Sequence, residues 1–188
     1  MAESKHFFEA IFGNSEIVLM DTNFILSFLG YDSDRAVAKQ CETLVYNTVA
    51  NGCALVYAFR SIEEIKHVVI RGHFESNGYD YDKEFLKKDP ARYSRLTREG
   101  LEMAQKYLRD IRNCPGVFNE PVGIINSSLC QKADEMMVKY SLKTADSLIL
   151  ASALVEEVDY LATRDTDMAK VDEPNLTVLL DDRSYRQK

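Results

Sequence analysis

Short apolar runs alternate with helix-like stretches along most of this 188-residue chain, and this alternation constrains its fold more than any other feature. Each run has the length of a buried strand, and the stretches between the runs carry apolar residues at helical spacing. The runs are "IVLM" at 17–20, "CALVYA" at 53–58, "DYLAT" at 159–163 and "NLTVLL" at 175–180. Strands that alternate with helices predict an α/β fold with a mostly parallel central sheet.

The stretches between these runs predict helices. Apolar periodicity and stop signals indicate helices over 22–28, 33–50, 61–72, 93–111, 128–140 and 144–157. Ser33 is a natural N-cap for the second of them. Residues 122–125 are expected to be extended, whereas residues 73–91, rich in Gly, Asp, Asn and Tyr, show little pattern. The tail at 181–188 is expected to fray.

Composition limits the class of protein. Hydrophobic residues make up 46% of the chain and charged residues 28%, which is the balance of a globular domain with a core. No run approaches the ~20 apolar residues of a membrane span, and the N-terminus lacks the pattern of a signal peptide, so a cytoplasmic protein is expected. The four cysteines form no CxxC pair, which disfavours a zinc or redox site.

Charge is unevenly distributed along the chain. The net charge of −7 disfavours a protein that coats nucleic acid by bulk attraction, but residues 71–113 hold ten Lys/Arg against eight Asp/Glu. Within 83–98, basic residues are interleaved with Phe85 and Tyr93, which is typical of a surface that binds single strands. A solvated helical face with nearby counter-charges is the alternative interpretation. The candidate substrate-binding residues in this segment are Lys87, Lys88, Arg92 and Arg95.

Four acids stand in apolar surroundings at the ends of strands or the starts of helices. Asp21 directly follows "IVLM", Asp165 follows "YLAT" by one residue, and Asp146 is the one charge between residues 144 and 155. Glu64 lies near the start of the helix after the second run. Because ligands of such folds bind at the carboxyl ends of the strands, these side chains are expected at one edge of the sheet.

Each acid also has a structural interpretation. Asp21 and Asp165 suit helix N-caps, and Asp146 suits the positive end of a helix dipole. Glu64 fits a capping box, since "SIEE" starting at Ser61 matches the S-x-x-E pattern. Together, however, the four carboxylates would repel, because two unit charges ~4 Å apart repel by about 4 kcal/mol at an effective dielectric of ~20. Mg²⁺ or Mn²⁺ would offset this repulsion, and such a site can activate water against a phosphodiester.

Three blocks of the sequence resemble, in the same order, the acidic motifs of PIN-domain proteins: "LMDTNFILSFL", "TADSLILASAL" and "YLATRDTDM". "SIEEI" lies where the family has an intervening glutamate; Glu63 and Glu64 both qualify, and Glu64, followed by Ile65, fits better. The resemblance covers residues 17–72 and 120–181. It implies a three-layer α/β/α, Rossmann-like fold in a single domain over residues 1–188, with a largely helical insertion at about 73–113.

The resemblance also implies an activity, a metal and partners. The family includes toxin ribonucleases of the VapBC type, so the chain is expected to be an endoribonuclease that uses one or two Mg²⁺ or Mn²⁺ ions. RNA, a second copy of the chain and an antitoxin protein are the expected partners. The implied catalytic residues are Asp21, Glu64, Asp146 and Asp165, of which the first, third and fourth would be metal ligands.

Several other residues have expected roles beside these acids. Asn23 and Thr163 match family positions that hydrogen-bond the carboxylates, and Asp167 would be a peripheral fifth acid. Arg164 either reaches a substrate phosphate or is an exposed residue at the end of a strand.

Two other interpretations compete with a nuclease. A non-catalytic PIN-like domain could bind RNA or a protein through residues 73–113, although retention of all four acids disfavours this. Phosphotransfer through an aspartyl intermediate is disfavoured because Asn23 stands where the haloacid-dehalogenase type needs a second acid. Receiver domains have an acid pair near the first strand, whereas Asp21 is alone.

Overall fold

A five-stranded, entirely parallel sheet forms the centre of the protein in a computed structural model that describes residues 5–31 and 34–186. The strands lie in the order β1-β5-β4-β2-β3. Their bounds are β1 Lys5–His6, β2 Ile17–Met20, β3 Ala54–Tyr57, β4 Tyr160–Thr163 and β5 Thr177–Leu180. The predicted α/β class is therefore confirmed, and the four expected runs are all strands.

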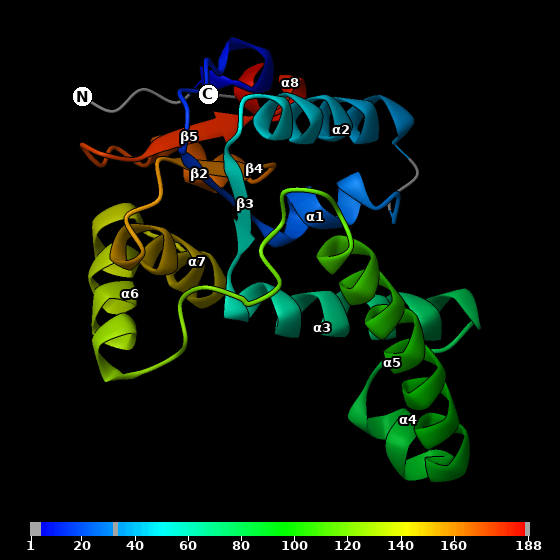
Figure 1. The fold of residues 1–188 in the computed structure, drawn as a ribbon. Helices are drawn as coiled ribbons and strands as arrows, with labels where there is room; N and C mark the ends of the chain where they lie inside the picture. The colour runs from blue at the N-terminus through cyan, green and yellow to red at the C-terminus, as the bar shows by residue number, and fades with distance from the viewer. Residues whose placement is uncertain (1–4, 32–33, 187–188) are drawn as a thin grey trace.

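Helices cover both faces of the sheet, which gives three layers (Figure 1). One face packs against α1 Thr22–Phe28, α2 Arg35–Ala50, α3 Phe59–Ser76 and the C-terminal part of α5 Pro90–Arg112. The other face packs against α6 Ser127–Tyr140 and α7 Thr144–Val155. The short helices are η1 Phe7–Glu9, α4 Lys83–Lys88, η2 Thr166–Lys170 and α8 Asp182–Arg186.

Burial on both faces explains why the strands read as continuous apolar runs. In β2, Val18 and Met20 face the core beneath α1 and α2, whereas Leu19 faces the core beneath α6 and α7. All three are completely buried. A strand of a parallel sheet that is covered on both sides needs apolar residues at every position, which removes the alternation seen in half-exposed strands.

Two helix starts differ from those expected. The predicted N-cap Ser33 lies outside the described residues; helix α2 is capped by Asp34, whose carboxylate accepts from the amides of Ala36 and Val37. Helix α3 begins at Phe59, so Ser61 lies inside its first turn. The prediction of a capping box between Ser61 and Glu64 is therefore wrong, and the carboxylate of Glu64 is available for another contact.

Residues 73–113 are more ordered than their sequence pattern indicated. They contain the end of α3, helix α4 and most of helix α5, and Figure 1 shows α4 and the N-terminal part of α5 projecting away from the sheet. Aromatic side chains pack together there, with ring centroids 4.9 Å apart for Phe74–Tyr81 and for Phe74–Tyr93. Residues expected to form an irregular excursion thus have a small core of their own.

The C-terminal tail also differs from expectation. Residues 182–186 form helix α8 directly after β5, and Asp181 between them is 1% exposed. The prediction that the tail frays is wrong for the described part of it. Strand β1, which the sequence did not indicate, pairs with β5 at the edge of the sheet.

Candidate metal centre

Register places the ends of three strands at one edge of the sheet. Met20 of β2 lies opposite Tyr57 of β3 on one side and Ala162 of β4 on the other. The pairing continues past Met20, because the amide of Asp21 donates to the carbonyl of Ala162 at 2.9 Å. The residues that follow these strands therefore meet at the carboxyl edge, where ligands of parallel sheets bind.

Asp21 is buried at this edge with both carboxylate oxygens engaged. It is the N-cap of α1: Oδ1 accepts from the amide of Thr22 at 2.6 Å, and Oδ2 accepts from the hydroxyl of Thr163 at 2.7 Å. Burial raises the pKa of Asp21 to about 7, against the two hydrogen bonds, and the charges of Glu64 and Asp146 raise it further.

Thr22 connects Asp21 to Glu64. Its hydroxyl donates to Oε2 of Glu64 at 2.7 Å, while its amide donates to Asp21. Sequence reasoning assigned the supporting role in this motif to Asn23 and missed Thr22, although both follow Asp21 directly. The side chain of Asn23 is exposed, and no site carboxylate accepts a hydrogen bond from it among residues 5–31 and 34–186.

Asp146, Asp165 and Asp167 form a second group of acids beside the first. One oxygen from each lies within 4.8 Å of the others, and all three residues are half-buried. Asp167, expected to be peripheral, thus lies within the group. Asp165 caps the helix η2 by accepting from the amide of Asp167 at 2.8 Å.

Within this group, Asp146 has a carboxylate oxygen that lacks a hydrogen bond among the described residues. Its Oδ2 is buried and has no hydrogen-bond partner in the described part of the chain. Burial raises its pKa to about 6, and the charges of Asp165 and Glu64 add to the effect. A buried acceptor without a donor is costly unless a cation or a proton occupies the space in front of it.

The threonine at the end of β4 joins the two groups. The hydroxyl of Thr163 donates to Asp21 and accepts from the amide of Asp165 at 3.0 Å. The set of ligands is entirely carboxylate, which suits Mg²⁺ or Mn²⁺ rather than zinc. The unpartnered oxygen of Asp146 and the oxygen-only donor set therefore fit a divalent ion held by Asp146, Asp165 and Asp167.

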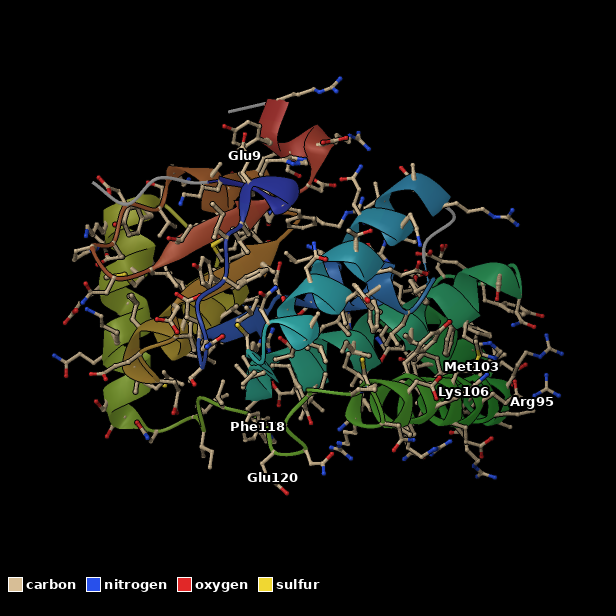
Figure 2. The ribbon with its side chains drawn as sticks, turned by 45° about the horizontal axis from the view of Figure 1, so that its top comes forward. Glu9, Arg95, Met103, Lys106, Phe118 and Glu120 are labelled. Atoms are coloured by element: carbon tan, nitrogen blue, oxygen red, sulfur yellow. The ribbon has the colours of Figure 1, made fainter. Side chains whose placement is uncertain are left out.

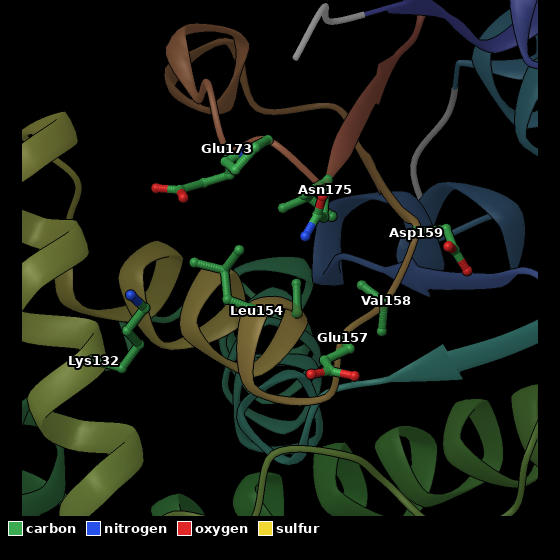
Figure 3. A pocket seen from close by; sticks show the side chains of 10 residues that line it. Lys132, Leu154, Glu157, Val158, Asp159, Glu173 and Asn175 are labelled. Carbon is green, nitrogen blue, oxygen red and sulfur yellow. The ribbon is translucent and has the colours of Figure 1, made fainter. Parts of the chain in front are cut away.

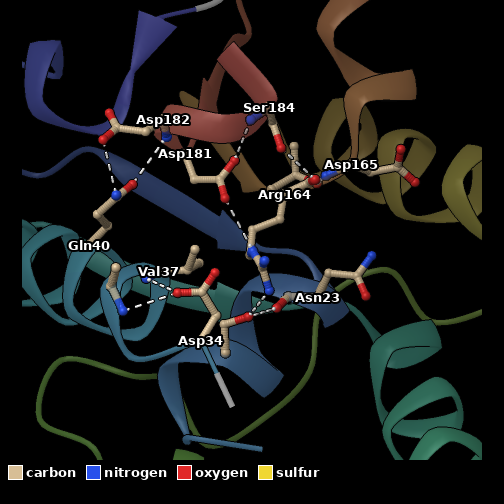
Figure 4. A network of polar contacts seen from close by, with 12 residues as sticks. Asn23, Asp34, Val37, Gln40, Arg164, Asp165, Asp181, Asp182 and Ser184 are labelled. Atoms are coloured by element: carbon tan, nitrogen blue, oxygen red, sulfur yellow. Dashed lines mark hydrogen bonds and ion pairs between the residues drawn. The ribbon is translucent and has the colours of Figure 1, made fainter. Parts of the chain in front are cut away.

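Arg164 is engaged within the protein and is not an exposed strand-end residue. Its side chain is 18% exposed, and its Nε lies 3.3 Å from Oδ2 of Asp181. The guanidinium also donates to the hydroxyl of Ser27 in α1 (Figure 4). These contacts direct its charge toward α1 and the C-terminal segment.

Three of the four candidate substrate-binding residues in the 73–113 segment are paired with acids. Ion pairs join Lys88 to Glu84, Arg92 to Asp89 and Arg95 to Glu99, at 3.3, 3.4 and 3.8 Å; Lys87 is exposed. Figure 2 shows Arg95 and Lys106 along the outer side of α5. Phe85 and Tyr93 pack into the aromatic cluster and are partly buried there. These observations favour the solvated helical face over a stacking surface.

Two hollows in the surface differ in where they lie relative to the sheet. A hollow of about 490 Å³ lies beside Asp159 and Leu176, which directly precede β4 and β5, and therefore belongs to the amino edge (Figure 3). Another, of about 310 Å³, adjoins Glu64 on α3. It is lined by Arg60, Glu63, Glu64, His67 and Val68.

The sequence of residues 117–174, which contain Asp146, Asp165 and Asp167, matches the family model of the PIN domain. This part of the chain is therefore similar to PIN-domain proteins. The resemblance to the PIN-domain family is thereby confirmed, and the parallel sheet between two helical layers is the PIN fold. No helix in residues 5–31 and 34–186 has the length and apolar character to cross a bilayer.

Two solved structures are similar to this chain at low sequence identity. This chain is similar to a chain of VapBC2 from Rickettsia felis bound to a DNA fragment from their promoter, with 16% identity, a TM-score of 0.50 and coverage of 88% of this chain and 99% of that one. A chain in a toxin–antitoxin complex from Klebsiella pneumoniae has 20% identity, a TM-score of 0.42 and coverage of 85% and 95%. A search of curated proteins gives no match.

Proposed function

We propose that this PIN domain is a metal-dependent nuclease, and specifically an endoribonuclease that hydrolyses RNA phosphodiester bonds. One observation carries the proposal: three carboxylates come within 4.8 Å of one another, and the buried oxygen of Asp146 among them has no protein donor. Acids are brought together in this way at a cost that a divalent cation offsets. The buried Asp21 beside them, with its raised pKa, adds to the same cost.

Each acid has a role in the proposed reaction. Asp146, Asp165 and Asp167 would hold Mg²⁺ or Mn²⁺, with Asp21 facing the same space. A bound ion of this kind lowers the pKa of water and stabilises negative charge on a phosphoryl group. Glu64, which the hydroxyl of Thr22 holds by one oxygen, leaves Oε1 to accept a proton from the attacking water.

We also propose partners, from the similarity in fold to a chain of VapBC2. Because the fold is that of a chain from VapBC2, we infer that the protein is the toxin of a type II toxin–antitoxin pair in the cytoplasm, with an antitoxin protein and a second copy of itself as partners. The single domain with an inserted 73–113 segment, and the contacts of Lys87, Lys88, Arg92 and Arg95 with RNA, stay predictions.

Replacing Asp21 tests the proposed activity. Asp21→Asn should abolish Mn²⁺-dependent cleavage of RNA, because it removes a charge from the acidic edge while preserving the side chain's shape. Cleavage of labelled single-stranded RNA, structured RNA and DNA by purified protein measures activity and substrate class together. Circular dichroism verifies that the variant is folded.

Asp110→Asn is the matched control, since Asp110 is an exposed residue of α5. It should leave cleavage unchanged. Full activity of contaminant-free Asp21→Asn protein would contradict the assignment, and cleavage of DNA alone would contradict the substrate class.

A further inference from the structure

The residue after β5 lies at the same edge of the sheet as the acids, but it faces α8. Asp181 accepts from the amide of Ser184 at 2.8 Å and pairs with Nε of Arg164 at 3.3 Å (Figure 4). It is 1% exposed, so this charge has little water to solvate it. A buried carboxylate of this kind fixes its cationic partner firmly, because separation would leave both charges poorly solvated.

The peptide unit between Arg164 and Asp165 is held at both of its polar atoms. The carbonyl of Arg164 accepts from the hydroxyl of Ser184 at 2.7 Å, and the amide of Asp165 donates to the hydroxyl of Thr163 at 3.0 Å. A peptide unit is planar, so fixing its oxygen and its nitrogen fixes its orientation. That orientation sets the position of the Asp165 Cα, from which the side chain leaves the backbone.

The hydrogen bonds of Thr163 also include Asp21. The hydroxyl of Thr163, which accepts from Asp165, donates to Oδ2 of Asp21 at 2.7 Å. The guanidinium of Arg164 meanwhile donates to Ser27 of α1, the helix that Asp21 caps. Two routes therefore lead from the C-terminal segment to the acids, one through the Arg164–Asp165 peptide unit and one through the guanidinium.

We infer that Arg164, Asp181 and Ser184 are positioning residues that set the orientation of Asp165 and Asp21 toward a metal ion, so that helix α8 is part of the framework of the metal centre. The inference rests on the proposed function. Contacts that orient metal ligands contribute to affinity, because they restrict the ligands to the geometry that the ion requires. Arg164, a candidate for substrate binding from sequence, thereby acts through Asp165.

Neighbouring aspartates provide a matched comparison. Asp181 and Asp182 both anchor α8, but Asp182 contacts Gln40 of α2 and His6 of β1, whereas Asp181 contacts Arg164. Asp181→Asn should weaken Mn²⁺ binding by about 10- to 100-fold, measured by titration calorimetry. Asp182→Asn should lower thermal stability while leaving the Mn²⁺ dissociation constant unchanged. A purely structural role for α8 predicts that both variants lose stability and that neither changes the dissociation constant, which would overturn the inference.

A pair of serines keeps the inference testable if Asp181→Asn does not fold. Ser184 and Ser152 are both buried, and each hydroxyl donates to a backbone carbonyl, at 2.7 and 2.8 Å. Ser152 lies in the C-terminal half of α7, and its hydroxyl bonds to the carbonyl of Leu148 in the same helix. Ser184→Ala should weaken Mn²⁺ binding, whereas Ser152→Ala should not. Equal dissociation constants for these two variants would overturn the inference.

The wild-type titration separates this inference from the proposed function. If the wild-type protein binds no Mn²⁺, the proposed function fails and the positioning role fails with it. If the wild-type protein binds Mn²⁺ and Asp181→Asn and Ser184→Ala bind it equally well, the proposed function stands and the positioning role is wrong.

Discussion

At the scale of single residues, Asp21 combines two roles that its two oxygens divide between them. Oδ1 caps helix α1 through Thr22, and Oδ2 meets the hydroxyl of Thr163 at the centre of the acidic edge. The cap therefore uses one oxygen of Asp21, and the other remains bound to Thr163 beside Asp165. The cost of burial is visible in its pKa, which is raised to about 7.

This raised pKa makes metal-free stability depend on pH. Between about pH 4 and pH 7, folded Asp21 keeps a proton that the unfolded chain releases near its ordinary value of 3.8, and Asp146, with a pKa of about 6, behaves similarly. The free energy of unfolding should therefore fall as pH rises through this window. Asparagine cannot ionise, so Asp21→Asn should reduce the slope.

Melting temperatures in a chelating buffer from pH 4.5 to 8 measure these slopes (roughly the window in which the two groups ionise). Asp110→Asn should keep the wild-type slope, because Asp110 is exposed. Identical slopes for Asp21→Asn and the wild-type protein would show that burial of Asp21 has no such effect.

At the scale of elements, the 73–113 segment shows how local composition can mislead. Basic residues interleaved with Phe85 and Tyr93 suggested a surface for single strands, yet the rings pack against Phe74 of α3. The composition of a segment is the same whether its aromatic side chains bind bases or fill a small core. The sequence therefore could not distinguish a binding surface from a core. The structure favours core packing, because these rings fill the space between α3 and α5. Gly100 lies at the contact between the two helices.

Gly100 permits the two helices to approach closely. A Cβ at this position would lie 2.9 Å from the Cα of Ile70, a backbone atom that can move only with α3. Gly100→Ala should destabilise the protein by about 1–3 kcal/mol through overpacking, which exceeds the ~1 kcal/mol that alanine gains over glycine in a helix. Urea unfolding measures the difference.

An exposed position on the same helix provides the comparison for Gly100. Gln105→Ala should be neutral or slightly stabilising, because Gln105 faces solvent. If Gly100→Ala were as stable as Gln105→Ala, the close approach of α3 and α5 would not be what holds the segment in place.

At the scale of the whole molecule, the sequence predicted the sheet and its acidic edge because both follow from simple regularities. Apolar runs locate the strands, and parallel strands must present their carboxyl ends together. Contacts between residues distant along the chain could not be predicted, since they depend on strand order and register. The pairing of Arg164 with Asp181 is one example, and the hydrogen bond from Thr22 to Glu64 is another. The start of α3 at Phe59 was missed because Ala58 carries no polar cap that would mark it.

The central claim is that the acidic edge of this protein binds a divalent ion. Crystals soaked in Mn²⁺ test it most directly, because anomalous scattering locates manganese without reference to activity. A peak within ~2.2 Å of carboxylate oxygens of Asp146 and of Asp165 or Asp167 is the predicted result, and the peak should be absent from Asp146→Asn crystals. No peak at these residues in the wild-type protein, or an equal peak in Asp146→Asn, would contradict the claim.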